Sequence, residues 1–403
     1  TTVHSLELQD QRVSQTQQSL IYGAGIRVLK DSCTGYAYTM DLSMPAMMNA
    51  ARFAATAGNG GERLSAAALP QVPAMPLLED NVSIELMKKR LLLLDETVRN
   101  LDGRIIKVKA AVATRDQQVL FVNSQGCSFT DYRPRASVFL RVVMEQDGQT
   151  QMGFATLSLQ KDFHQFSETD FTDLAKTAVS RTAFLFDAVQ PEGGEMPVVM
   201  APGASGILMH EAIGHAFEAD FNRVGTSIFA GKMGQRVCSP EVTIVDDGTQ
   251  AEDVGCLRWD DEGIPGQRTV LVEKGVLNTL LYNMETADKA GKVTTGNASK
   301  GSYDSPVGIR PFSMYLTGGT LTQAQLLQQA GNGIYINRLD GLHAGANPVT
   351  GDFSLQSAGY LIENGEKVLL MAHHHAVMDI YKKELKPFKP VFITGRETDA
   401  KKD

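Results

Sequence analysis

The sequence of 403 residues has few cysteines and no long apolar run. Its four cysteines, at Cys33, Cys127, Cys238 and Cys256, are too few and too scattered for a disulfide framework, which predicts a reducing, cytoplasmic location. No segment approaches the roughly 18 apolar residues of a membrane span, so we expect no membrane partner. The N-terminus lacks an initiator methionine and a basic-then-apolar signal pattern, and we therefore expect the chain to begin after residues that were removed.

Basic residues are also in the minority. Lys and Arg number 38 against 46 Asp and Glu, a net charge of −8. An acidic chain without a basic block is poorly suited to bind a phosphate backbone, so we expect no nucleic-acid partner. The hydrophobic fraction of 43% and the charged fraction of 21% are typical of a globular protein, and the length allows two or three domains.

Hydrophobic periodicity and turn residues predict an α+β fold. We expect helices at 44–58, 83–101, 169–189 and 322–330, a loop at 58–80, and an antiparallel meander from 105 to 159. Ser83 is a candidate cap for the second helix, and Thr169–Asp170 for the third. The Pro- and Gly-rich stretch 190–197 marks a boundary between an N-terminal, sandwich-like α/β domain (1–190) and a mainly antiparallel, β-rich C-terminal domain (197–403) that carries one helix with a chemical motif.

That motif is the run His210-Glu211, followed by His215. Two neutral imidazoles are typical zinc ligands, and a Glu beside the first His can take a proton from a metal-activated water. The alternative is a buried helix with two structural histidines.

The spacing is H-E-x-x-x-H, one residue longer than H-E-x-x-H. At about 100° per residue, positions i and i+5 lie roughly 140° apart around a straight α-helix, so His210 and His215 could not share a metal there. A one-residue π turn would bring them together, and Gly214 is where a backbone adjustment costs least. On a regular helix Glu211, His215 and Glu218 would share a face instead.

Several stretches resemble the TldD branch of the TldD/PmbA family. The most specific is Gly206–Gln235, which contains the His-Glu motif and the downstream Glu218-Ala-Asp220. The resemblance continues in shorter stretches at Gly23–Val28, Gly35–Tyr38, Val245–Thr249, Asp260–Gln267, Thr294–Asn297, Gly345–Phe353 and Tyr360–Gly365.

This resemblance implies a zinc metallopeptidase that acts on unfolded or extended peptides and forms a homodimer or a heterodimer with a PmbA-like paralogue. It implies a metal in an enclosed chamber between an N-terminal α/β domain and a β-rich C-terminal domain. His210 and His215 match the family's metal ligands, and Glu211 matches its general base. PmbA-like members lack this motif, so the chain resembles the catalytic side, although the stretch Gly345–Gly365 is more similar to the PmbA side than to the TldD side.

The chain departs from the pattern at the third ligand. TldD-like proteins have a cysteine in a Cys-Gly-Lys stretch well after the segment that Tyr360–Gly365 resembles, whereas no cysteine follows Lys367 here. We therefore expect weak zinc binding and a truncated or discontinuous tail. The alternative function is a non-catalytic, peptide-binding partner with an incomplete metal site.

Other residues could also donate to a metal: Glu218, His343 and the run His373–His375. Cys238 and Cys256 are expected to be inert thiols. The acidic pairs at Asp246–Asp247 and Asp260–Glu262 are expected to be turn caps, with calcium or a peptide amino terminus as alternatives.

Overall fold

The computed structural model describes residues 1–30, 33–57, 83–189, 191–250, 254–347, 349–350 and 352–378, without the side chains at 340–346, 354, 356, 369–370 and 372–378. The predicted loop at 58–80 and the tail beyond Met378 lie outside these residues. The described residues of Thr1–Phe186, Thr249–Gly266 and Asn283–Gly308 form one compact unit, which we call the first unit. Those of Asp187–Gly248, Gln267–Tyr282 and from Ile309 onward form the second unit. The sequence-based domain boundary at 190–197 stays a prediction.

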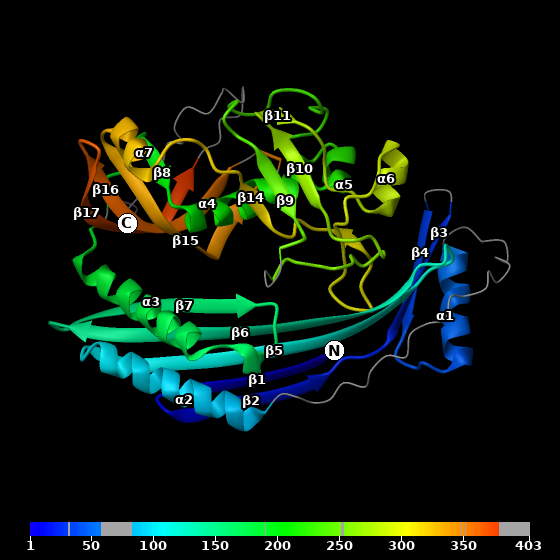
Figure 1. Ribbon diagram of the computed structural model, residues 1–403, viewed down its shortest axis with the longest axis horizontal. Helices are drawn as coiled ribbons and strands as arrows, with labels where there is room; N and C mark the ends of the chain where they lie inside the picture. Colours follow the sequence, from blue (N-terminus) through cyan, green and yellow to red (C-terminus); the bar gives the residue numbers. More distant parts are fainter. Residues whose placement is uncertain are drawn as a thin grey trace, which may run out of the picture. The chain divides into compact units, whose positions relative to one another are not determined.

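The first unit is built on a five-stranded antiparallel sheet with the strand order β2-β1-β5-β6-β7 (Figure 1). Its strands are β1 (Thr2–Gln9), β2 (Arg12–Leu20), β5 (Ile105–Val122), β6 (Ser128–Gln146) and β7 (Gln149–Leu159). Asp10 and Gln11, between β1 and β2, both have positive φ, as do Asp147 and Gly148 between β6 and β7. Such two-residue turns match the twist of the strands that they join. The predicted meander at 105–159 is confirmed.

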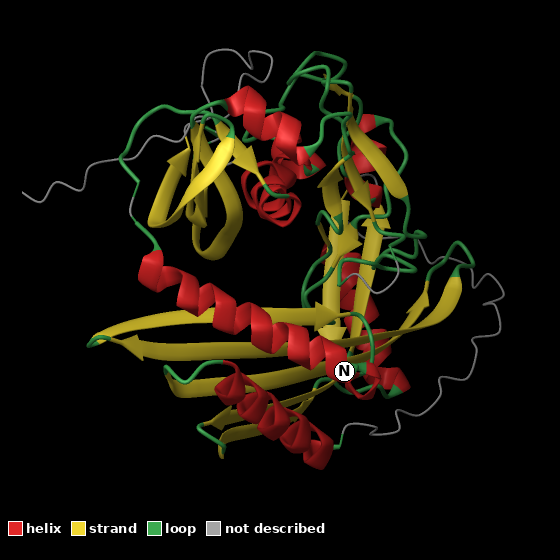
Figure 2. Cartoon of the chain, turned by 60° about the vertical axis from the view of Figure 1, so that its left-hand side comes forward, coloured by secondary structure: helices red, strands yellow, loops and turns green. Residues whose placement is uncertain are grey.

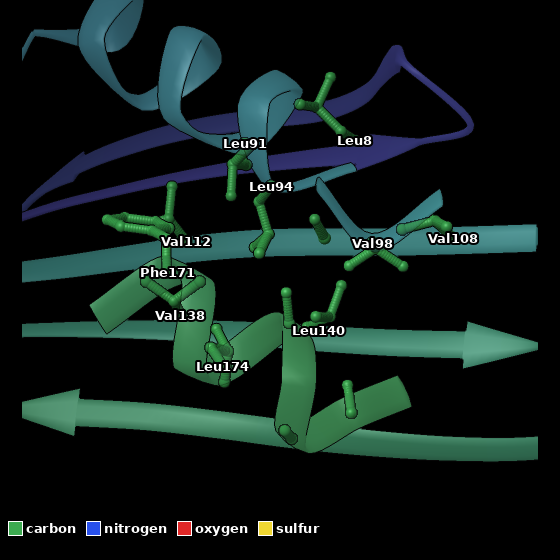
Figure 3. Close-up of a cluster of buried hydrophobic side chains, with 14 of the residues drawn as sticks. Leu8, Leu91, Leu94, Val98, Val108, Val112, Val138, Leu140, Phe171 and Leu174 are labelled. Carbon is green, nitrogen blue, oxygen red and sulfur yellow. The ribbon is translucent and has the colours of Figure 1, made fainter. Parts of the chain in front are cut away.

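Two long helices, α2 (Ile84–Leu101) and α3 (Glu168–Asp187), pack against this sheet (Figure 2). Their apolar residues and the inward-facing residues of the strands form one core cluster (Figure 3). The cluster includes Leu8, Leu91, Leu94, Val98, Val108, Val112, Val138, Leu140, Phe171 and Leu174. Since both helices contribute to the same cluster, they cover the same face of the sheet.

Side-chain caps explain where these helices begin. The Ser83 hydroxyl accepts a hydrogen bond from the N–H of Leu86, which confirms the predicted cap of α2. Helix α3 is capped by Ser167 together with Asp170, so the predicted cap at Thr169–Asp170 is confirmed for Asp170 only. The Ser167 hydroxyl accepts from the N–H of Asp170, and the Asp170 carboxylate accepts from the N–H of Ser167. Each side chain thus satisfies a free N–H group at the helix start.

A hairpin of β3 (Ala24–Lys30) and β4 (Cys33–Thr39) belongs to the first unit, and α1 (Met44–Ala57) packs against it. Two later segments of the chain also belong to this unit, and charged side chains of Thr249–Gly266 contact β-strands of the unit and also the other segment, Asn283–Gly308: the N–H groups of Met284 and Lys300 donate to the carboxylates of Glu262 and Asp261. Arg27 of β3 forms an ion pair with Glu262, and Arg133 of β6 forms one of 2.8 Å with Asp261. The remaining short elements are a 3-10 turn (Phe163–Gln165), α6 (Met284–Ala290), β12 (Ala298–Ser299) and β13 (Gly308–Ile309).

The second unit contains two four-stranded sheets. In the sheet β17-β16-β15-β8, the first three strands are antiparallel and β8 runs parallel to β15; the sheet β11-β10-β9-β14 is antiparallel. The strands are β8 (Val198–Met200), β9 (Ile244–Asp247), β10 (Arg268–Glu273), β11 (Val276–Leu277), β14 (Met314–Leu316), β15 (Gly333–Ala346), β16 (Phe353–Glu363) and β17 (Glu366–Met378). The helices are α4 (Pro202–Leu208), α5 (Ala219–Arg223) and α7 (Gln323–Ala330).

The predicted α+β class is confirmed, since helices and mostly antiparallel sheets occur in both units. Within the described part of the chain, no helix is both long and apolar enough to cross a membrane.

Candidate metal centre

The motif lies on a helical segment that begins after β8. Pro202 occupies the first turn of α4, where its missing N–H costs nothing. Ala204, Leu208 and Ala212 form one face of this segment and pack on β15 and β16 in the core of the second unit. His210 is two residues, or about half a turn, from Leu208, so it lies on the face away from this sheet.

The helix changes its winding at the motif. A π turn covers Met209–Ile213 and a 3-10 turn covers Gly214–Phe217. The ring centroids of His210 and His215 are 5.1 Å apart, and their planes are inclined by 78°. The π turn predicted from the H-E-x-x-x-H spacing is therefore confirmed, and it brings together two imidazoles that a straight helix would separate.

Gly214 has a different role from the expected one. Its φ of −57° and ψ of −49° are ordinary helical values, whereas Ile213 takes up the irregularity with a φ of −123°. A Cβ at position 214 would lie 3.2 Å from the carbonyl oxygen of Met209 and 3.5 Å from the sulfur of Met314. Glycine is thus favoured here because the π turn brings the Met209 carbonyl close, and not because the backbone needs glycine's freedom.

His215 lies in hydrogen-bond contact with a buried carboxylate. Its Nδ1 lies 2.6 Å from Oε1 of Glu218, and Oε2 of Glu218 lies 3.0 Å from Nη1 of Arg310. The Glu218 side chain is 0% exposed, whereas those of His215 and Arg310 are 34% and 56% exposed. The sequence placed Glu218 on the face of His215 as a possible metal ligand, but its carboxylate instead contacts the imidazole. Nothing in the sequence signals Arg310, which is 92 residues further on.

His210 is half-buried, and Glu211 beside it is exposed. Burial lowers the pKa of His210, and the nearby charges of His215 and Arg310 lower it further, against an opposing effect of Glu211. The lowered pKa favours the neutral imidazole, which is the form that binds a metal. The exposed Glu211 carboxylate is accessible to water.

The acidic pairs behave differently from one another. Asp260 accepts hydrogen bonds from the N–H groups of Glu262 and Ile264, which confirms its expected role as a turn cap. Asp246 instead accepts from the N–H groups of Phe312 and Ser313, in a segment far along the chain, so these two bonds join distant segments and do not cap a turn.

Cys238 is buried, and burial raises the pKa of its thiol to about 11, consistent with an inert side chain. His343 lies in β15 and His373 in β17, at positions where only the backbone is described.

Three known protein domains match successive parts of the chain. Residues 1–58 match the PmbA/TldA metallopeptidase domain 1, residues 78–183 match the central domain, and residues 193–374 match the C-terminal domain. The chain belongs to the PmbA/TldD metallopeptidase family. The resemblance found in the sequence is thereby confirmed.

Individual members of the PmbA/TldD family agree with this assignment. The Metalloprotease TldD homolog of Haemophilus influenzae is 32% identical over 373 residues, which cover 89% of this chain and 77% of that protein. A metalloprotease of Methanothermobacter thermautotrophicus is 29% identical over 335 residues, covering 82% and 73%. The crystal structure of TldE from Thermococcus kodakarensis has the same fold, with a TM-score of 0.71 at 20% identity over 98% of this chain and 93% of that one. The chain is thus related to proteins named as metalloproteases, and that name implies a metal cofactor.

The separation of the two imidazoles is compatible with a shared zinc ion. Two imidazoles bound to one tetrahedral zinc at about 2.0–2.1 Å have ring centroids roughly 5 Å apart, and the observed distance is 5.1 Å. A catalytic zinc usually has three protein ligands. Among the residues with described side chains, however, no group of three His, Cys, Asp or Glu could hold a metal. Among these residues, His210 and His215 are two imidazoles close enough to be donors to one metal ion, without a third donor beside them.

Proposed function

We propose that the chain is a zinc-dependent peptidase of the HExxxH type that cleaves unfolded or extended peptides. The convergence of His210 and His215 on the π turn carries this proposal, because it supplies two zinc ligands in a member of a metallopeptidase family. Bound zinc would polarise the scissile carbonyl and lower the pKa of a water molecule.

Glu211 is the proposed general base. It follows the first histidine directly, and its exposed carboxylate accepts the proton of the attacking water and returns it to the leaving amine. Glu218 is a poor candidate for the general base, because its two carboxylate oxygens already contact His215 and Arg310.

The proposal extends to partners and location. Four free cysteines, of which Cys238 is buried, are consistent with a cytoplasmic protein. The family suggests a homodimer or a heterodimer with a PmbA-like paralogue, and a specific interface would bury more than about 1,000 Å². Light scattering of the purified chain across micromolar concentrations tests the homodimer, and a monomer throughout would exclude it.

The variant E211Q tests the function most selectively. It should keep zinc affinity while hydrolysis of an unstructured peptide falls by about 10²–10⁴-fold, because only proton transfer is removed. Zinc affinity is measured by titration with a competing chelator, and hydrolysis by mass spectrometry of the products. Loss of zinc together with activity would show that Glu211 is a ligand. If the wild-type chain binds an extended peptide but neither zinc nor hydrolysis is detected, the alternative of a non-catalytic peptide-binding partner replaces the peptidase.

A further inference from the structure

We propose that Glu218 and Arg310 are positioning residues that fix the His215 ring in the tautomer able to bind a metal. The inference rests on the proposed function, since it assigns a role to two residues next to a proposed zinc ligand. It concerns how the imidazole is prepared before any metal arrives.

The hydrogen-bond chemistry determines the tautomer. Arg310 is always cationic and can only donate, and its Nη1 lies 3.0 Å from Oε2 of Glu218. The paired Glu218 is therefore a carboxylate, which can only accept. At 2.6 Å from Oε1 of Glu218, Nδ1 of His215 must donate. In the neutral ring the lone pair is then on Nε2, the nitrogen that remains for a metal.

The backbone around Glu218 is fixed from both sides. The N–H of Leu281 donates to the carbonyl of Phe217 at 2.9 Å, and the N–H of Ala219 donates to the carbonyl of Leu281 at 3.0 Å. The side-chain amide of Asn222 donates to the carbonyl of Glu218 at 2.9 Å. With its backbone held in this way and its side chain fully buried, Glu218 offers His215 a carboxylate in one fixed place.

Arg310 is held as well. Its Nη1 also donates to the carbonyl of Ile309 at 2.8 Å. Just after it, the N–H groups of Phe312 and Ser313 donate to Oδ1 of the buried Asp246, at 2.8 and 3.0 Å. The loop that carries the guanidinium is therefore tied to the end of β9. A metal-bound histidine commonly donates its other N–H to a carboxylate, and that contact orients the ring.

Zinc affinity provides the first test. Removing such a contact typically costs about 10–100-fold in metal affinity, so we expect E218A to raise the zinc dissociation constant by this factor. E218Q should lose less, because its amide oxygen can still accept from Nδ1. R310M removes the exposed guanidinium that contacts Glu218. It should raise the dissociation constant for zinc without unfolding the protein. Glu273 is an exposed carboxylate on β10, and its variant E273Q is the matched control that should bind zinc as wild type does.

The second test reads the tautomer directly in zinc-free protein. With ¹⁵N-labelled histidine, long-range ¹H–¹⁵N spectra report which ring nitrogen carries the proton. We expect the neutral His215 ring to carry it on Nδ1 in wild type and E273Q, and to lose this preference in E218A. Circular dichroism checks that each variant is folded. If E218A is unfolded, the comparison of R310M with wild type tests the inference instead.

The outcomes separate the two proposals. Wild type that binds zinc, with unchanged affinity in folded E218A and R310M, would overturn the inference and leave the proposed function standing. A wild-type His215 proton on Nε2 would overturn the inference alone as well. Failure of the wild-type chain to bind zinc through His210 and His215 would remove the proposed function and the inference together.

Discussion

Substitution of Gly214 by alanine tests whether the π turn shapes the metal centre. The new Cβ would lie 3.2 Å from the Met209 carbonyl oxygen, which must move by a few tenths of an ångström, whereas its 3.5 Å distance from the Met314 sulfur is an ordinary contact. Overpacking of this kind costs about 1–3 kcal/mol. Against it, alanine is favoured over glycine in a helix by about 0.8–1.0 kcal/mol. The overpacking cost is at least as large as this gain, and we expect a net loss of about 0–2 kcal/mol in the free energy of unfolding.

The effect on zinc should be larger than the effect on stability. The displaced carbonyl belongs to the turn that sets the distance between His210 and His215, and a metal site tolerates little error in ligand position. We expect a dissociation constant for zinc about tenfold higher or more. Urea unfolding of zinc-free protein measures stability, and chelator competition measures the affinity.

A glycine eight residues earlier provides the control. Gly206 lies within α4, and a Cβ there would meet nothing within 4 Å. G206A should therefore gain up to about 1 kcal/mol in stability and leave zinc binding unchanged. Wild-type zinc affinity in folded G214A would refute the view that the close approach at the π turn sets the site.

Further predictions concern the stability of the first unit. Burial raises the pKa of Asp260 to about 6, so its contribution to stability is complete below about pH 4 and is lost as the pH rises through 6. The unfolding free energy of wild type minus that of D260N should therefore fall between about pH 4 and pH 7, and a rise in urea titrations would contradict this. Leu91 is fully buried in the core of α2 and the sheet, and L91A should lower the unfolding free energy by about 2–5 kcal/mol. S83A removes the cap of α2 and should cost about 1 kcal/mol; a thermal melt with an unchanged midpoint would count against the cap.

Local signals in the sequence predicted the parts of this fold that depend on near neighbours. The helix periodicity and the cap at Ser83 predicted α2, and turn residues predicted the meander of β5, β6 and β7. The π turn was also predictable, because His210 and His215 at i and i+5 can meet only if the helix gains a residue per turn.

Contacts between residues far apart in the sequence could not be predicted from the sequence. Arg310 pairs with Glu218 across 92 residues, and no periodicity relates a loop arginine to a helix carboxylate. In the same way, the pairs of Arg27 with Glu262 and of Arg133 with Asp261 connect the later segment Thr249–Gly266 to the strands of the first unit. Only the folded chain brings such charges together, and a single sequence carries no local trace of them.

The central claim is that His210 and His215 share one zinc ion. The direct measurement is a zinc titration of the chelator-free chain, carried to saturation, for wild type, H210N and H215N. The account predicts one zinc per wild-type chain and a dissociation constant at least about tenfold higher in each variant. Equal affinity in all three proteins would show that any zinc is bound elsewhere, and it would contradict the account.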